Sequence, residues 1–529
     1  MRLSGVSSHK ASYNALQTPL NIGDMSVISA TCFNTVHARI MCEPGVAREI
    51  QEYFTFEVPN AKFTPAYKNK YWDGKIRLFS PFNGLLYIGL LDYLAEFARE
   101  RNYTLQLDRE FTQKPPQVTP EQITEFLNEL KLHAHGKTIT PHPHQLDAIT
   151  AAINRERALL LSPTASGKSL IIYALLRWYQ NIIPPDRKIL IVVPTISLVS
   201  QMKSDFADYA KNTDWDAEEN CHTIFGGQQK MDNRQIVIST WQSIYELPKS
   251  YFDQFEVVVG DEAHLFKAQS LTSIMTKLTK CPYRIALTGT LDGTKTNKLA
   301  IEGLFGTTLK VTSTKDLIDS KLLSTISIDC IVLNYPPEVC KTLKEATYQE
   351  ELEFLVGNTA RNKFISKLAV STKGNTLVLF QFVEKHGKPL YELIKKQAKG
   401  RRVFFVHGET EADYRESVRQ ITESEDNAII VASYGTFSTG INIRSLKNII
   451  FASPSKSRIR VLQSIGRQLR KSEKKDEARL YDISDDLRWK ARKNHTLKHF
   501  VERVKIYSEE GFPYKLIKLP VMSPKKDVI

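Results

Sequence analysis

Short apolar segments alternate with helical segments through most of this chain, and this alternation constrains the fold more than any other feature. Five apolar segments lie within residues 136–314: ALLLS, ILIVVPT, IVIST, EVVVGDE and RIALTGT. Five more lie within residues 315–486: TLVLFQF, VFFVHG, AIIVASY, NIIFASP and ARLYDIS. Near-continuous apolar runs separated by helices are typical of parallel strands covered on both faces. The sequence therefore predicts an α/β protein with two doubly wound parallel-sheet lobes, over 136–314 and 315–486.

The segments outside the two lobes show weaker patterns. Residues 1–24 lack a convincing periodicity and are predicted to be a flexible leader, which makes Met25 a candidate for the true start. Residues 25–112 mix strand and helix patterns and predict a small N-terminal α+β domain, followed by a linker and helix over 113–135. Residues 487–529 are predicted to form a basic helical C-terminal segment, because an apolar stripe recurs at helical spacing. The stripe consists of Leu497, Phe500, Val501 and Val504.

Composition narrows the class of protein. No stretch approaches the roughly 20 continuous apolar residues of a membrane span, so no membrane association is expected. The 6 cysteines are scattered and form no C-x-x-C pair, which argues against a zinc site or a disulfide framework. This usage fits a reducing cytoplasm, that of the host if the protein comes from a phage. The net charge of +14 is typical of a polyanion binder, although a merely soluble basic protein is an equal alternative.

The stretch SPTASGKS at 162–169 ends like a phosphate-binding loop, but Ser162 stands where that pattern has its first glycine. It lies between an apolar strand and an apolar-faced helix, which is the context such a loop requires. Lys168 would reach the β- and γ-phosphates of ATP, and the Ser169 hydroxyl would ligate Mg²⁺. A glycine-bearing strand-to-helix turn is the alternative. Backbone N–H groups would surround the phosphates, with candidates at Thr164, Ala165, Ser166 and Gly167.

The stretch GDEAHL at 260–265 places two acids at the end of a predicted strand. Asp261 would hold Mg²⁺, and Glu262 would orient and deprotonate the attacking water. His264 would relay the state of the nucleotide to the rest of the protein. A solvated acidic loop is the alternative.

The stretch VLQSIGRQLR at 461–470 lies in the second lobe. On a helix, Gln463, Arg467 and Arg470 share one face at positions i, i+4 and i+7. Two arginines directed across a lobe interface can stabilise charge on the transferred phosphate, so hydrolysis would depend on lobe closure. The alternative is a basic stripe on the surface.

Taken in order, these stretches resemble the motifs of superfamily-2 DEAH/DExH helicases over about 350 residues. The matching stretches are PHPHQLDAI, PTASGKS, VPTISLVSQ, FGG, STWQS, DEAH, TGT, FQFVEKHG, ASYGTFSTGINI and QSIGRQLR. KYWDGKIRLF, LLYIGLL and YQEELEFLVGNTARNKFISKLA are further similar to the UvsW recombination-repair helicases of T4-like phages. The resemblance implies two RecA-like lobes, an adenine-reading position at Gln145 and a nucleotide contact at Gly440.

The resemblance also implies an ATP-driven remodeller of branched DNA that acts on forks, four-way junctions, D-loops and R-loops in phage recombination, repair and replication. Its expected partners are branched or single-stranded DNA, with RNA–DNA hybrid, recombination proteins and single-strand-binding proteins as further candidates. We expect a monomer. Two alternatives remain open at this point: a duplex translocase that does not separate strands, and a strand-annealing or binding protein with a vestigial ATP site.

The resemblance assigns the phosphodiester contacts to five small residues: Thr195, Gly226, Gly227, Thr240 and Thr439. Glycine N–H groups and threonine hydroxyls bind phosphate without reading bases, which predicts selectivity for structure rather than sequence. The stretch KNKYWDGKIRLF adds Lys70, Trp72, Lys75 and Arg77. Cations interleaved with rings suit a nucleic-acid surface. The alternative is a hairpin with Trp72 in the core and solvated lysines.

Overall fold

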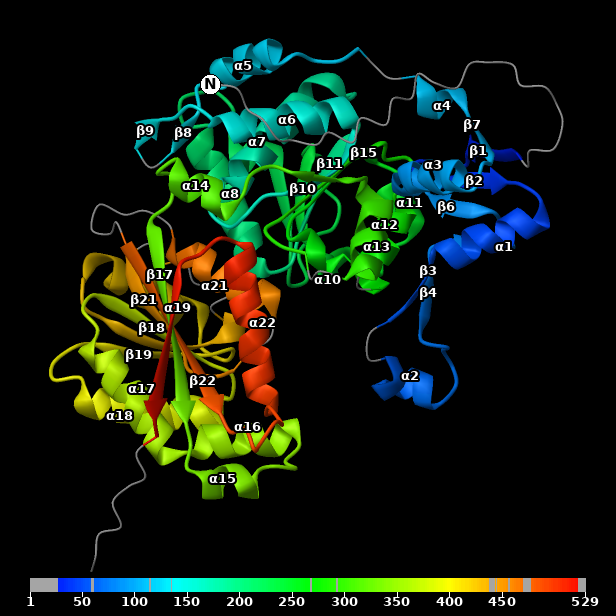
Figure 1. Ribbon diagram of the computed structural model, residues 1–529. Coiled ribbons are helices and arrows are strands. Elements are labelled where there is room, and N and C mark those ends of the chain that lie inside the picture. The colour runs from blue at the N-terminus through cyan, green and yellow to red at the C-terminus, as the bar shows by residue number, and fades with distance from the viewer. Residues whose placement is uncertain are drawn as a thin grey trace, which may run out of the picture.

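Seven parallel strands form the sheet of each α/β lobe. The computed structural model describes residues 27–58, 61–113, 116–134, 136–266, 269–291, 294–436, 443, 445–454, 457–469 and 477–521. In the first lobe the strand order is β12 (Cys221–Ile224), β13 (Ile236–Thr240), β11 (Lys188–Val193), β14 (Phe255–Gly260), β15 (Tyr283–Thr288), β10 (Arg157–Leu161) and β16 (Thr308–Lys310). All of these strands pair in parallel. The first predicted sheet is therefore confirmed (Figure 1).

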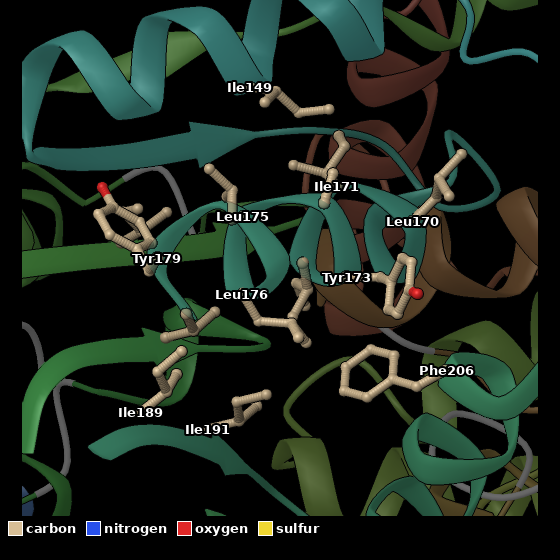
Figure 2. Close-up of a cluster of buried hydrophobic side chains, with 14 of the residues drawn as sticks. Ile149, Leu170, Ile171, Tyr173, Leu175, Leu176, Tyr179, Ile189, Ile191 and Phe206 are labelled. Carbon is tan, nitrogen blue, oxygen red and sulfur yellow. The ribbon is translucent and has the colours of Figure 1, made fainter. Parts of the chain in front are cut away.

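Helices cover this sheet because its strands are apolar on both faces. The longer ones are α6 (Pro143–Arg155), α7 (Lys168–Ile182), α8 (Ile196–Tyr209), α12 (Gln269–Lys277) and α13 (Lys295–Phe305). Short helices are α9 (Ala217–Asn220), α10 (Trp241–Ile244), α11 (Lys249–Phe252) and η4 (Ala263–Leu265). Helix α7 is apolar nearly all round, as expected of a buried helix. Figure 2 shows its side chains between Ile149 of α6, Phe206 of α8 and Ile189 and Ile191 of β11.

The second lobe repeats the parallel arrangement. Its strand order is β19 (Val403–Val406), β20 (Ile429–Ser433), β18 (Asn375–Phe380), β21 (Leu446–Phe451), β22 (Glu477–Asp486), β17 (Thr325–Asn334) and β23 (Tyr514–Pro520). Its helices are α14 (Thr314–Asp319), α15 (Pro337–Thr342), α16 (Tyr348–Gly357), α17 (Thr359–Ser371), η5 (Val383–Gly387), α18 (Lys388–Gln397), α19 (Ala412–Ser424), α21 (Arg458–Gln468) and α22 (His495–Glu509). The second predicted sheet is thus confirmed as well.

The C-terminal segment differs in part from the prediction. Helix α22 confirms its helical character, but the chain continues into β23, which pairs in parallel with β17 at the edge of the second-lobe sheet. The predicted apolar stripe is wrong at Val501, which is 46% exposed, whereas Ile506 and Tyr507 are buried instead. Tyr507 turns inward because its hydroxyl donates to the buried carboxylate of Asp482 at 2.9 Å. The segment is therefore built into the second lobe.

The N-terminal domain confirms the predicted α+β character. Its five-stranded sheet has the order β5 (Phe79–Ser80), β6 (Leu85–Tyr87), β2 (His37–Met41), β1 (Val27–Cys32) and β7 (Thr104–Leu107), with helices α1 (Pro44–Tyr53) and α3 (Leu91–Glu100). Residues 55–77, called the arm below, contain the two-stranded sheet of β3 (Thr55–Glu57) and β4 (Lys75–Arg77), with η2 (Ala61–Phe63) and α2 (Pro65–Lys68) between them. Figure 1 shows the arm extending away from the five-stranded sheet, with α2 at its tip.

The N-terminal domain packs directly on the first lobe. The Tyr93 hydroxyl donates to the buried carboxylate of Glu302 on α13 at 2.7 Å. The turn η3 (Ile88–Leu90) approaches α13 so closely that a Cβ at Gly89 would overlap the Glu302 carbonyl oxygen. Leu299 of α13 is buried in the core of the N-terminal domain. The two units therefore share apolar surface and hydrogen bonds rather than only a linker.

The residues between the N-terminal domain and the first lobe form α4 (Arg109–Thr112), α5 (Pro120–Glu129), β8 (His133–Ala134) and β9 (Lys137–Thr138). Helix α5 confirms the predicted helix, and its start is fixed by a capping box between Thr119 and Gln122. Its apolar face joins the core of the first lobe through Ile123 and Leu127. Within the described ranges, no helix has the length and apolar character needed to cross a bilayer.

Candidate nucleotide site and nucleic-acid surface

The loop at 162–169 joins β10 to α7, as predicted, and Ser162 has a structural role in it. Ser162 is fully buried, and its hydroxyl lies 2.5 Å from that of Ser166. The Ser166 hydroxyl donates to the Pro163 carbonyl at 2.7 Å, so Ser162 must be the donor to Ser166. The backbone reverses at Ala165 (φ +68°) and Gly167 (φ +83°), in the left-handed region. Ser162, the residue that departs from the glycine pattern, therefore stabilises the loop through a buried hydrogen bond.

Lys168 is the first residue of α7 and lies among the groups predicted to act with it. Its Nζ is 3.4 Å from the carbonyl oxygens of Ser162 and Pro163. A Cβ added at Gly289, which follows β15, would lie 3.7 Å from the same Nζ. The charge of Lys168 also favours the ionised forms of Asp261 and Glu262. The loop, the acidic pair and the β15 end therefore border one space.

Gln145 lies at the start of α6 and is bonded to the loop. Its Nε2 donates to the Ser166 carbonyl at 2.9 Å, and its Oε1 accepts from the His142 backbone N–H at 2.8 Å. His144 Nε2 lies 3.1 Å from the same carbonyl. A Cβ at Gly167 would overlap the Gln145 amide, which explains why glycine stands there. Gln145 thus holds the loop in this structure, while its contact with adenine stays a prediction.

The two acids follow β14, and their environments drive their pKa values apart. Burial and the charge of Glu262 raise the pKa of Asp261 to about 6. Burial also disfavours ionised Glu262, but His264, Lys168 and Arg467 together outweigh it, so the Glu262 pKa lies below its usual range. Glu262 therefore stays ionised to lower pH than Asp261 does, and a general base must be ionised to accept a proton.

His264 joins the acids to the end of β15. Its Nδ1 lies 3.3 Å from Glu262 Oε2 and 3.1 Å from Thr288 Oγ1. The Thr288 hydroxyl in turn donates to the Thr290 carbonyl at 3.0 Å. A movement of the Glu262 carboxylate would therefore disturb the contact between His264 and Thr288 in the TGT segment. Such a continuous set of contacts is what a relay of the nucleotide state requires.

Helix α21 of the second lobe meets the phosphate loop. A Cβ at Gly466 would come within 2.5 Å of the Thr164 side chain, and Ala165 packs against the second-lobe core. Arg467, the next residue, contributes to the low pKa of Glu262. Gln463 lies half-buried one turn earlier on α21. Arg470, Thr439 and Gly440 lie outside the described residues.

Gln468, which was not among the predicted site residues, fixes the end of α21. Its side-chain amide donates to the carbonyls of Lys447 and Arg479.

A cavity of about 640 Å³ opens between the two lobes beside the loop. Pro163, Thr164, Gly289 and Thr290 line it from the first lobe, and Leu462, Ile465 and Gly466 line it from α21. Its volume is in the range of small-molecule sites. Ser169, which follows Lys168 on α7, and Asp261, which follows β14, offer a hydroxyl and a carboxylate, the hard oxygen ligands that Mg²⁺ prefers. The donor chemistry of the site therefore fits this ion.

The predicted backbone contacts in the first lobe occupy different environments. Thr195 caps α8, with its Oγ1 3.1 Å from Ser197 Oγ. Gly226 and Gly227 both have positive φ, and a Cβ at either would meet open space. Thr240 is buried, and its hydroxyl is 2.9 Å from that of Ser243. The two glycines are thus exposed, whereas the hydroxyls of Thr195 and Thr240 both already have partners.

The arm carries the predicted basic and aromatic residues at 70–77. Trp72 is half-buried, outside the core of the N-terminal domain, and its indole N–H donates to the Lys75 carbonyl at 2.8 Å. Lys70 and Lys75 are exposed, and Arg77 pairs with Asp73. Tyr71, which the prediction omitted from its contacts, is 86% exposed.

Comparison with known proteins agrees with this geometry. Residues 28–108 match the family described as DNA helicase UvsW, N-terminal; residues 138–293 match Type III restriction enzyme, res subunit; and residues 360–472 match Helicase conserved C-terminal domain. The ATP-dependent DNA helicase uvsW of Enterobacteria phage T4 is 35% identical over 496 residues, which cover 90% of this chain and 96% of that protein.

Two solved structures are also similar. The crystal structure of T4 UvsW is 33% identical and has a TM-score of 0.50, covering 94% of this chain and 100% of that one. An ATP-dependent type ISP restriction-modification enzyme bound to DNA shares the fold at 15% identity and a TM-score of 0.54, over 74% of this chain and 32% of that one.

The identity and coverage confirm the resemblance in the helicase motifs and the N-terminal stretches. Two RecA-like lobes, a candidate nucleotide site where they meet and the UvsW-type N-terminal domain occur here in one chain. The chain therefore belongs to the UvsW family of ATP-dependent DNA helicases.

Proposed function

We propose that this helicase uses the energy of ATP hydrolysis to unwind and branch-migrate branched DNA, including forks, four-way junctions, D-loops and R-loops. The observation that carries the proposal is the meeting of Lys168, Glu262 and Arg467, which come from three elements and two lobes. The charges of Lys168 and Arg467 both act on Glu262, and Gly466, the residue before Arg467, lies against Thr164 of the phosphate loop. If the ATP site were vestigial, we would not expect it to retain a general base and a phosphate-binding lysine in the first lobe together with an arginine from the second lobe. The uvsW relative, an ATP-dependent DNA helicase, supports DNA as the substrate, and the exposed arm supports contact with more than a single strand.

In the proposed reaction each residue acts on a defined atom. Lys168 and the N–H groups of residues 164–167 bind the β- and γ-phosphates. Glu262 accepts a proton from the attacking water, and Arg467, with Arg470 beside it, stabilises the charge that develops on the transferred phosphoryl group. When bound, Mg²⁺ neutralises phosphate charge, with Ser169 and Asp261 holding it. Gln145, Gln463 and Gly440 complete the nucleotide contacts.

DNA is proposed to cross both lobes over the small residues Thr195, Gly226 and Gly227, with Thr240 and Thr439 as further candidates. Because Arg467 reaches the site only from the second lobe, closure of the lobes around DNA would complete the set of catalytic residues.

We also propose single-strand-binding and recombination proteins as partners, RNA–DNA hybrid as a further substrate, a monomeric state and a cytoplasmic location. The domain boundaries predicted above are retained, with the described part of the C-terminal segment, residues 487–521, attached to the second lobe.

The direct test of this function is a substrate panel. Purified protein with ATP and Mg²⁺ is expected to resolve forks, four-way junctions and R-loops faster than it separates plain duplexes. A protein that displaces a triplex strand but separates no duplex would instead be a translocase. If nucleic acid did not stimulate ATP hydrolysis, the protein would instead be a strand-annealing or binding protein with a vestigial ATP site.

Lys168→Ala is expected to reduce ATP turnover by about 10²–10³-fold, because a preorganised charge at the transferred phosphate is lost. DNA binding should persist and still weaken steeply with salt, since it rests on phosphate contacts elsewhere. Steady-state ATPase assays and a salt titration of fork binding measure the two effects. Lys367→Ala, an exposed lysine on α17, is the charge-matched control. Unchanged turnover in Lys168→Ala would refute the assignment of the phosphate loop.

Tyr71→Ala is expected to weaken binding to forked DNA by about 5- to 100-fold, the effect of losing about 1–3 kcal/mol of base stacking. The arm offers Lys70, Trp72 and Lys75 beside this ring, with Arg77 next to Asp73. ATPase activity on saturating single strand should not change, because the arm lies outside the cleft.

The matched control is Phe82→Ala. Phe82 is 99% exposed but lies in the turn between β5 and β6, outside the arm. Equal losses in the two variants would mean that general surface hydrophobicity, rather than the arm, supports binding. If Tyr71→Ala bound forked DNA as tightly as the wild type, the arm would not lie on the path of the DNA.

A further inference from the structure

Tyr209 is the last residue of α8, and its hydroxyl lies 2.8 Å from the Ser169 hydroxyl on α7. Either oxygen can be the donor. The two residues are 40 positions apart, and no helicase motif discussed above contains Tyr209. The contact therefore joins a helix with no assigned catalytic residue to the hydroxyl proposed to ligate Mg²⁺.

The packing around Tyr209 fixes where its hydroxyl lies. Its ring packs on Tyr173 of α7 with centroids 5.6 Å apart. Figure 2 shows Tyr173 and Phe206 facing each other across the same α7–α8 contact. The preceding residue, Asp208, is held by buried His133, whose Nδ1 is 2.8 Å from Asp208 Oδ1. Tyr209 is thus held in place by its own packing on Tyr173 and by the contact of the neighbouring Asp208 with His133. A side chain that orients a second side chain must be fixed in this way.

A hydroxyl ligand has a specific requirement that this contact meets. When a serine oxygen offers a lone pair to a metal ion, its single proton must be directed away from the ion. A fixed acceptor for that proton selects the ligating rotamer in advance, and such partners of metal ligands typically contribute about 10–100-fold in metal affinity. The Tyr209 oxygen at 2.8 Å is placed to accept the Ser169 proton.

We propose that Tyr209 is a positioning residue that holds Ser169 in the orientation for Mg²⁺ binding. The inference rests on the proposed function, in which Ser169 is a metal ligand. Helix α8 begins just after Thr195, a proposed DNA contact, and ends at Tyr209. One helix therefore connects a DNA-contact position to the orientation of a metal ligand.

The test measures binding of a fluorescent, non-hydrolysable ATP analogue in Mg²⁺ and in EDTA, so it does not depend on turnover. Tyr209→Phe keeps the ring and removes only the hydroxyl. We expect it to reduce the Mg²⁺-dependent gain in affinity by about 10-fold, with the affinity in EDTA unchanged. In a Ser169→Ala background, Tyr209→Phe should have no further effect, because the oriented group is absent.

Tyr179→Phe is the matched control, since the buried Tyr179 hydroxyl has no hydrogen-bond partner among the described residues. It should leave both affinities unchanged, and thermal melting of each variant checks folding. A Tyr209→Phe variant that behaves like Tyr179→Phe, loses affinity equally in EDTA, or gains Mg²⁺-dependent affinity overturns the inference. If wild-type affinity is independent of Mg²⁺, or Ser169→Ala retains the full gain, the metal assignment of the proposed function fails instead.

Discussion

Arg467→Ala is expected to lower kcat for ATP hydrolysis by about 10³-fold or more, with a much smaller change in nucleotide affinity. The reason is that an arginine supplied across an interface stabilises charge that exists only in the transition state. Helix α21 touches the phosphate loop at Gly466 and Thr164, and the charge of Arg467 reaches Glu262. Single-turnover kinetics and nucleotide titrations separate the two quantities.

Two further variants sharpen this prediction. Arg467→Lys keeps the charge but loses the planar fork, so it should recover only part of the rate. Arg419→Ala removes an arginine that pairs with Glu416 and Glu423 on its own helix, and its kcat should stay normal. DNA stimulation should also vanish in Arg467→Ala, because closure would no longer deliver the group. A loss of nucleotide affinity with normal kcat would make Arg467 a binding residue instead.

The sequence was sufficient to predict elements whose pattern is local and uniform. Strand β10, the loop and α7 follow one another without interruption, and the strand and the helix are mostly buried, so apolar runs marked them clearly on either side of the loop. Strand β23 was missed for the opposite reason. It is an edge strand with lysines at 515 and 518 and a mostly exposed surface, so it lacks the continuous apolar run on which the ten predicted strands of the two lobes were recognised. Strands β12, β16 and β17 were not among those ten either.

The side-chain contacts that support the site could not be predicted at all. Ser162 looked like a departure from the loop pattern, and only its bond to Ser166 shows that it braces the loop. The Tyr209–Ser169 pair spans two helices, and neither residue has a local signal for the other. The residues at the site were predictable because catalysis demands particular side chains, whereas their supports are set by packing.

The docking of the N-terminal domain is another such long-range feature, and it affects how that domain can be studied. Tyr93 and Glu302 are 209 positions apart, and Leu299 is 3% exposed under the domain. Deleting residues 1–110 would uncover this surface and leave Glu302 without one of its hydrogen-bond donors, so ATPase and DNA binding would both suffer. Point changes in the arm therefore separate DNA binding from stability better than truncation does.

Glu262→Gln is expected to reduce ATP hydrolysis by about 10²–10⁴-fold, the usual contribution of a general base. The amide is nearly isosteric, so the bonds of the loop and the approach of His264 should be retained, and ATP should still bind. The Glu262 pKa lies below its usual range whereas that of Asp261 is raised, so Glu262 keeps its charge to lower pH than Asp261 does. Equilibrium binding and single-turnover hydrolysis measure the two outcomes. Normal turnover would exclude Glu262 as the base.

Glu256→Gln is a matched control, because Glu256 lies on the same strand, β14, and pairs with Arg187 away from the loop. It should hydrolyse ATP normally. The double variant Glu262→Gln/Arg467→Ala adds a further test. Residues that act as a unit on one transition state are strongly non-additive, so the double variant should be little slower than Arg467→Ala alone. Multiplied effects would instead mean that the base in the first lobe and the arginine in the second act in separate steps, with lobe closure no longer setting the moment of hydrolysis.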